Sequence, residues 1–363
     1  MNNLSPASAI TLANGVKIPV LGFSIEEIAK KSYNIRTQTE LILEAIQAGF
    51  RYFDTAEDHG GLRALGRAIK MSGIPREEFF ISSKMRLDEM VDGRFNQAID
   101  ETLLQLEMDY LDLYCIHWPG YLATDWPQKI AFIDAYCGRE IKKTDNGDTD
   151  GLIQFYQKGL ARAVGVCNVE IHHMEELLGS PKCTVKPMIN QSHFHPLHAC
   201  TELREYCEKQ EIAFGGLFEE NELYVQTKPR MCTDVNRFGL LYQTDEDHIK
   251  ANYAVRIDPK RRSSEFTQNP NDLSKNPRRE KGFFDDCEGI TKIARKYGKT
   301  NGQVVSRWSM QHGVVTTVKA FLPDQIRSEY NVFDFVLSDE DMRIIDGFNI
   351  GMRFGYHPDY IDF

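Results

Sequence analysis

Short apolar runs alternate with amphipathic stretches along most of the chain, with a repeat of roughly 30 residues. Eight runs have the nearly continuous apolar character of parallel strands that are buried on both faces. They are Val20–Phe23, Tyr52–Ala56, Phe79–Lys84, Leu111–His117, Ala163–Asn168, Pro187–Phe194, Ile212–Leu217 and Val314–Lys319. Helical spacing is clearest in Thr37–Ala48 and Phe95–Leu106. Eight strands that each precede a helix predict a closed (β/α)8 barrel of the TIM type.

The N-terminal segment Ala9–Phe23 carries two short apolar runs on either side of Asn14-Gly15. Asn-Gly is typical of a type I′ turn, in which both central residues take a positive φ, so we expect a β-hairpin ahead of the barrel. The 363 residues fit a single domain over 1–363, because α/β barrels of this size fold as one unit.

Two connections are longer than the repeat requires, Thr124–Asp150 and Glu219–Gly282. Both follow the carboxyl ends of strands, so we expect long loops at the C-terminal face, which carries the active site in such barrels. The second contains a basic stretch, Pro259–Gly282. This stretch is either a solvated surface loop or a segment whose cationic side chains contact phosphate or an acidic partner.

Composition narrows the classes of function and location. The net charge of −10 disfavours a general nucleic-acid binder, which needs clustered positive charge. No apolar run has the length of a membrane span, and the N-terminus lacks the pattern of a signal peptide. The eight cysteines lack CxxC spacing, which favours free thiols in a reducing compartment. We therefore expect a cytoplasmic protein that binds neither nucleic acid nor membrane, of undetermined oligomeric state.

Polar side chains close or follow four consecutive predicted strands. Asp54 and His59 follow the second strand, Lys84 ends the third, His117 ends the fourth and Asn168 ends the fifth. A lysine at the end of an apolar strand needs a partner, and Asp54 is the natural one. Each residue alone has a structural explanation, an ion pair or a core histidine. Together, on neighbouring strands, they favour a catalytic corner at the barrel rim.

Several segments, in order, resemble the aldo-keto reductases. AGFRYFDTAEDHGG is similar to that family's GFRxxDTAxxYGNE signature, and ISSK and LDLYCIHWP resemble its strands with the catalytic lysine and histidine. GVCN, NQSHFHP and the C-terminal run that begins VVTTVKAF resemble further family segments. The resemblance implies NAD(P)H-dependent reduction of a small aldehyde or ketone to an alcohol. It places catalytic roles on Asp54, Lys84 and His117, and cofactor-binding roles on Asn168, Gln191, Phe214 and Lys319.

His59 stands where the family has its catalytic tyrosine, five residues after Asp54. An imidazolium is a stronger acid than a phenol but is scarce near a charged lysine at pH 7, whereas a neutral imidazole still donates a hydrogen bond. Three interpretations of His59 therefore stay open. It is a working acid with an acidic pH optimum, it serves an altered reaction, or it marks lost catalysis.

The cofactor side also departs from the family pattern. Gln325 replaces the arginine that grips the adenosine phosphate, and an amide cannot bond two phosphate oxygens as a guanidinium does. We expect NADP(H) as the cofactor. NAD(H) is one alternative, and weak or absent cofactor binding is another. No metal is expected, because His195-Pro196 matches a structural pair of the family. The alternative functions are non-redox acid–base catalysis and a catalytically inactive binding or regulatory barrel.

Overall fold

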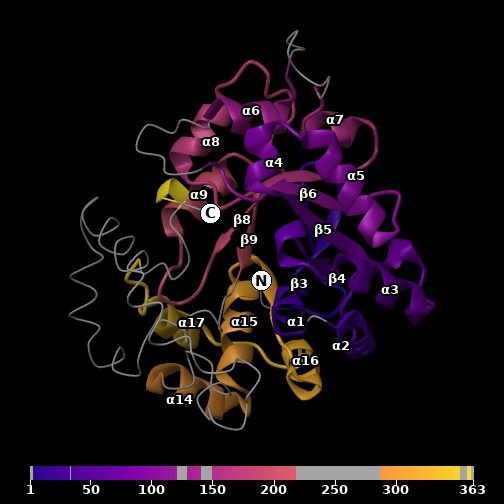
Figure 1. The fold of residues 1–363 in the computed structure, drawn as a ribbon. Helices are drawn as coiled ribbons and strands as arrows, with labels where there is room; N and C mark the ends of the chain where they lie inside the picture. Colours follow the sequence, from indigo (N-terminus) through magenta and orange to yellow (C-terminus); the bar gives the residue numbers. More distant parts are fainter. Residues whose placement is uncertain are drawn as a thin grey trace, which may run out of the picture.

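Eight parallel strands close into a barrel in the order β10-β3-β4-β5-β6-β7-β8-β9. The strands β3, β4, β5, β6, β8 and β9 are labelled in Figure 1. The computed structural model describes residues 3–32, 34–120, 129–139, 149–217, 287–351 and 358–360. The barrel strands are β3 (Leu21–Ser24), β4 (Tyr52–Asp54), β5 (Phe80–Met85), β6 (Leu113–Ile116), β7 (Val164–Cys167), β8 (Ile189–His193), β9 (Ala213–Leu217) and β10 (Val315–Val318). The predicted TIM-type barrel is confirmed, and each of the eight predicted strands contains one of these strands or overlaps it.

Helices surround this barrel. They are α1 (Glu26–Lys31), α2 (Ile35–Ala48), η1 (Glu57–His59), α3 (Leu62–Ser72), η2 (Arg76–Glu78), α4 (Leu87–Asp92), α5 (Phe95–Leu106), α6 (Lys129–Cys137), α7 (Leu152–Gln157), α8 (Ile171–Leu178), α9 (Thr201–Lys209), α14 (Glu288–Tyr297), α15 (Asn301–Gln311), α16 (Pro323–Tyr330), α17 (Asp339–Asp346) and η7 (Pro358–Tyr360). The two helices predicted from periodicity are α2 and α5. None of the helices in the described ranges combines the length and hydropathy that a bilayer crossing requires.

The predicted N-terminal hairpin is present as β1 (Ala9–Thr11) and β2 (Lys17–Pro19), but its turn is not type I′. Leu12 N–H bonds to the Val16 carbonyl at 2.8 Å, so the loop has three residues rather than two. Only Gly15 in this loop has a positive φ, 85°. A tight turn followed by one left-handed glycine is the usual three-residue hairpin loop, and it needs no positive φ at Asn14.

The first long connection, Thr124–Asp150, is not a loop throughout. Its residues 129–137 form α6, which buries Phe132, Ile133 and Tyr136. The apolar residues of α6 occur around most of the helix, which packs against α4, α7 and β6, and this explains why a connection that looks polar overall contains a helix. The second connection, Glu219–Gly282, and its basic stretch lie outside the described residues. The seven cysteines within the described ranges are free thiols.

Two glycines allow the close packing that positions the barrel rim. A Cβ on Gly22 of β3 would lie 2.2 Å from the ring of Tyr52, so the missing side chain makes room for this tyrosine inside the barrel. A Cβ on Gly66 of α3 would lie 2.1 Å from the Leu106 carbonyl oxygen, so only glycine lets α3 approach α5 so closely. Because the strands are parallel, their carboxyl ends meet at one rim.

Candidate active site

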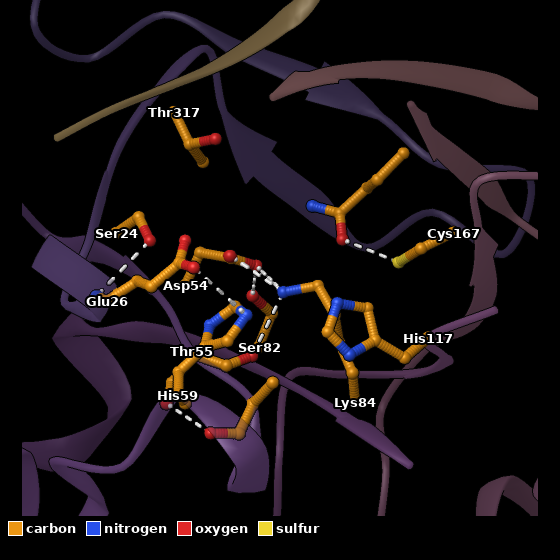
Figure 2. Close-up of polar contacts among 12 residues, drawn as sticks. Ser24, Glu26, Asp54, Thr55, His59, Ser82, Lys84, His117, Cys167 and Thr317 are labelled. Carbon is orange, nitrogen blue, oxygen red and sulfur yellow. Dashed lines mark hydrogen bonds and ion pairs between the residues drawn. The ribbon is translucent and has the colours of Figure 1, made fainter. Parts of the chain in front are cut away.

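A buried ion pair between Asp54 and Lys84 lies near the carboxyl ends of the neighbouring strands β4 and β5 (Figure 2). The Lys84 ammonium donates to both oxygens of the Asp54 carboxylate, at 2.8 and 2.7 Å, and to the Thr55 carbonyl at 3.0 Å. Ser82 donates to Asp54 at 2.6 Å. Burial alone would lower the pKa of Lys84, but the Asp54 carboxylate leads the groups that together outweigh burial, and the pKa is raised. Lys84 is therefore a fixed cation, as the sequence predicted for this pair.

Tyr52 lies next to Ser82, the residue that donates a hydrogen bond to the Asp54 carboxylate. The Tyr52 hydroxyl accepts a hydrogen bond from Gln191 Nε2 at 2.9 Å, and its oxygen lies 3.3 Å from Ser82 Oγ, whose single proton is donated to Asp54. These contacts join β4, β5 and β8 across the barrel interior. Burial raises the pKa of Tyr52 well above its ordinary value, so the hydroxyl stays protonated. The contact between Tyr52 and Ser82 holds Ser82 in place, and the hydrogen bond from Ser82 then orients the Asp54 carboxylate.

His59 enters the site from η1, the short helix that follows β4. Its Nε2 lies 3.8 Å from Glu26 Oε1, its ring centroid lies 5.2 Å from that of His117, and its side chain is 13% exposed. Burial lowers the pKa of His59 to about 4; the carboxylate of Glu26 opposes this shift, and the charge of His117 adds to it. At pH 7 the ring is therefore neutral. It can donate one hydrogen bond or offer one lone pair.

His117 follows β6 and faces a carboxylate from the same turn as His59. Its Nδ1 lies 3.4 Å from Asp58 Oδ2, and the His117 side chain is 8% exposed whereas that of Asp58 is 38% exposed. Burial would raise the pKa of Asp58, but His117 leads the groups, His59 and Lys84 among them, that together hold this pKa below its usual range. Asp58 is therefore ionised at neutral pH and connects the buried corner to solvent.

Glu26 contributes a second carboxylate to the same corner. It is 6% exposed and makes ion pairs with Lys319 and Lys30. Burial would raise the pKa of Glu26, but Lys319 and His59 lead the groups that bring it well below its ordinary value. The Lys319 ammonium thus already has an anionic partner within the protein. This ion pair joins the segment after β10 to α1, which begins two residues after β3.

The other predicted cofactor residues lie on neighbouring strands. Asn168 takes a left-handed backbone with φ 58°, its Nδ2 donates to the His117 carbonyl at 3.1 Å, and its buried Oδ1 has no hydrogen-bond partner among the described residues. The Gln191 amide is engaged at both ends, by Tyr52 and by the Cys167 thiol at 3.3 Å. Phe214 is buried edge-on against Phe194.

The structure therefore brings Asp54, Lys84, His59 and His117 into one corner, as predicted, and places Asn168 directly beside it. Sequence reasoning missed Glu26 and Asp58. Both carried a signal: Glu26 lies two residues beyond the first barrel strand, and Asp58 precedes the unusual His59. Because acidic residues are common in the first turn of a helix, Glu26 reads as a helix start when the sequence is seen alone.

Comparison with known proteins gives one consistent family. The sequence profile described as the aldo/keto reductase family matches residues 21–217 and 253–350. The chain is 32% identical to the glyoxal reductase of Bacillus subtilis (strain 168) over 354 residues, which cover 98% of this chain and 97% of that protein. It is 27% identical over 350 residues to a methylglyoxal reductase of Salmonella typhimurium (strain LT2), covering 96% of each.

Solved structures agree on the fold. The crystal structure of an aldo-keto reductase from Bombyx mori in complex with NADP superposes with a TM-score of 0.68 and 24% sequence identity, covering 97% of this chain and 99% of that one. An aldo/keto reductase structure from Brucella melitensis gives a TM-score of 0.67 with 23% identity, covering 94% and 99%. The barrel is thus shared over nearly the full length.

Proposed function

Because the chain belongs to the aldo/keto reductase family, a family of oxidoreductases, we propose that it reduces a small aldehyde or ketone to the alcohol with NADPH as hydride donor and NADH as the alternative donor. The observation that carries this proposal is the convergence of Asp54, Lys84, His59 and His117 in one buried corner at the active face of the barrel. The relatives that reduce glyoxal and methylglyoxal point to short dicarbonyl compounds as first substrates.

The described residues fit a nicotinamide beside this corner. Asn168 offers a buried carbonyl oxygen that lacks a partner among them, and a carboxamide N–H would satisfy it. Phe214 lies on the next strand after Gln191 and would supply an aromatic face for the ring. Lys319 would meet the phosphate end of the cofactor, where Glu26 competes for its ammonium. When bound, the cofactor supplies a hydride to the carbonyl carbon.

The histidines then act on the carbonyl oxygen. His59 is neutral at pH 7 because burial lowers its pKa to about 4, so it would polarise the oxygen by donating an N–H hydrogen bond. His117 lies beside it, at 5.2 Å between ring centroids, and would make the second contact to the same oxygen. The proton that completes the alcohol would arrive from solvent through Asp58 and then His117. Asp58 Oδ2 lies 3.4 Å from His117 Nδ1.

Asp54 and Lys84 act on the negative charge that develops on the carbonyl oxygen during the reduction: Lys84 stabilises it, and Asp54 holds Lys84 in place. The Lys84 cation is fully buried, so its field on a nearby alkoxide is screened less than a surface charge would be. Asp54 holds the ammonium in place through two hydrogen bonds and limits the cost of burying it.

One observation favours a second candidate, a barrel that has lost or changed the redox reaction. The only charge assigned to the cofactor phosphate in this scheme, that of Lys319, is partly neutralised by Glu26, which also pairs with Lys30. Such a barrel would bind NADPH weakly and would act in non-redox proton transfer or in binding alone.

A cofactor titration separates the two candidates. NADPH and NADH are added separately to the full-length protein, and the nicotinamide fluorescence and melting temperature are followed. Saturable binding, with oxidation of the cofactor when glyoxal or methylglyoxal is added, supports the reductase. No response up to millimolar cofactor contradicts it.

A further inference from the structure

Asp58, His59 and His117 bring one carboxylate and two imidazoles together at the mouth of the barrel. Their potential ligand atoms all lie within 4.8 Å of one another. We propose that these three side chains form a binding site for a divalent transition-metal ion of the zinc class, and that a bound ion occupies the position of the substrate's carbonyl oxygen. The metal site itself stands on this geometry alone. Its overlap with the position of the substrate oxygen rests on the proposed reductase function.

The spacing suits a metal centre. Zinc binds imidazole nitrogen and carboxylate oxygen at about 2.0–2.2 Å, so ligand atoms in a tetrahedral site are about 3.4 Å apart. His117 Nδ1 lies 3.4 Å from Asp58 Oδ2, and His59 Nε2 lies 4.0 Å from Asp58 Oδ1. Glu26 Oε1 is a further oxygen at 3.8 Å from His59 Nε2. Small side-chain rotations would bring the three ligands into range of one ion.

Hydrogen bonds do not account for the cluster. The distances from the Asp58 oxygens to the two imidazoles exceed the usual range of N–H···O bonds. Nδ1 of His117, the atom that faces Asp58, belongs to a side chain that is only 8% exposed and has no hydrogen-bond partner within the described part of the chain. A buried polar atom without a partner is costly, and an ion bound at His117 Nδ1 would supply one.

The ligand set selects the class of metal. Two imidazoles with one carboxylate suit zinc, cobalt, nickel or copper, whereas magnesium and calcium prefer sites made of oxygen alone. His59 is decisive, because it supplies the second nitrogen. Lys84, whose charge acts on both Asp58 and His59, is paired with Asp54, which reduces its repulsion of a second positive charge.

A bound ion would compete with the carbonyl substrate. In the proposed reaction His59 and His117 contact the substrate oxygen, and an ion held by both rings would lie between them. The site would therefore give the enzyme an inhibitory response to zinc that depends on His59.

Cobalt binding tests the site without reference to activity. The full-length protein is freed of metal with a chelator, which is then removed, and Co²⁺ is added while its visible absorption is recorded. We expect one ion per chain with the intense bands of a four- or five-coordinate site, displaced by one equivalent of Zn²⁺. His59→Phe should weaken binding by at least about 100-fold, more than the usual effect of losing an outer-shell partner. Asp58→Asn, which keeps the shape of the side chain, should weaken it in the same direction.

The control variant is His172→Ala. His172, His173 and Asp359 form a second group with the same spacing, and His172 is half exposed. We expect this variant to keep the cobalt spectrum. The proposal is overturned if the wild-type protein gives no such spectrum, or if His172→Ala abolishes it while His59→Phe does not. A folded reductase that binds no cobalt refutes the metal site and leaves the proposed function intact. If the protein binds cobalt at this site but has no reductase activity, the metal site is supported and the proposed function is refuted.

Discussion

Replacing Asp54 with Asn leaves the Lys84 ammonium buried without its anion. The carboxylate oxygens lie 2.8 and 2.7 Å from Lys84 Nζ, which corresponds to a gross attraction of about 6 kcal/mol at an effective dielectric constant of about 20. Removing one member of a buried pair typically costs about 3–5 kcal/mol, because the other charge stays desolvated. We expect Asp54→Asn to lower the free energy of unfolding by an amount in that range, since Lys84 is 0% exposed and keeps only neutral acceptors, the Thr55 carbonyl and the amide oxygen of the new side chain.

Urea denaturation of the full-length protein at pH 7 measures this loss. Asp88→Asn is the matched control, because it removes the same charge from an ion pair with Arg86 whose side chains are 41% and 38% exposed. Exposed pairs contribute less than about 1 kcal/mol. The double variant Asp54→Asn with Lys84→Met should recover most of the lost stability, because neither charge remains. A loss below about 1 kcal/mol for Asp54→Asn, or no recovery in the double variant, would refute this reasoning.

Three further outcomes are expected. His59→Tyr should raise kcat for carbonyl reduction by about 10²-fold, because a phenol beside Lys84 restores a proton donor; a fall in kcat would instead identify His59 as an adapted catalyst. Glu26→Gln should tighten NADPH binding several-fold in fluorescence titrations by releasing Lys319, whereas the control Glu27→Gln, whose carboxylate pairs with Lys31, should not; equal effects would contradict this. In the presence of a metal chelator, the melting temperature should fall as the pH drops from 6.5 towards 4, because His59 is protonated in the unfolded chain before it is protonated in the folded protein. If the melting temperature of His59→Phe changes with pH just as steeply, His59 is excluded as the cause.

The barrel was predictable because its strands are buried on both faces and therefore read as continuous apolar runs. Finer features depended on details that a pattern does not carry. The hairpin at Asn14-Gly15 was predicted correctly, but its three-residue loop follows from the pairing of Leu12 with Val16, which the dipeptide alone does not specify. The helix α6 was missed within a connection that is polar overall.

The candidate site divides in the same way. The pairing of Asp54 with Lys84 follows from elementary cost, since a buried lysine requires an anion. The pairing of Lys319 with Glu26 joins residues 293 positions apart and exists because β10 closes the barrel beside β3. No local pattern encodes that contact. Asp58 reaches His117 only through the shape of the short helix η1.

Transfer of the cofactor's own hydrogen to the product is the defining step of the proposed reduction, and isotope labelling measures it. The full-length protein is incubated with methylglyoxal and NADPH that carries deuterium at both C4 positions, and the product is analysed by mass spectrometry and NMR. We expect an alcohol with one deuterium on the carbon that was the carbonyl, formed in step with oxidation of the cofactor. An unlabelled product, or binding of NADPH with no alcohol formed from any small aldehyde or ketone, would contradict the proposed function.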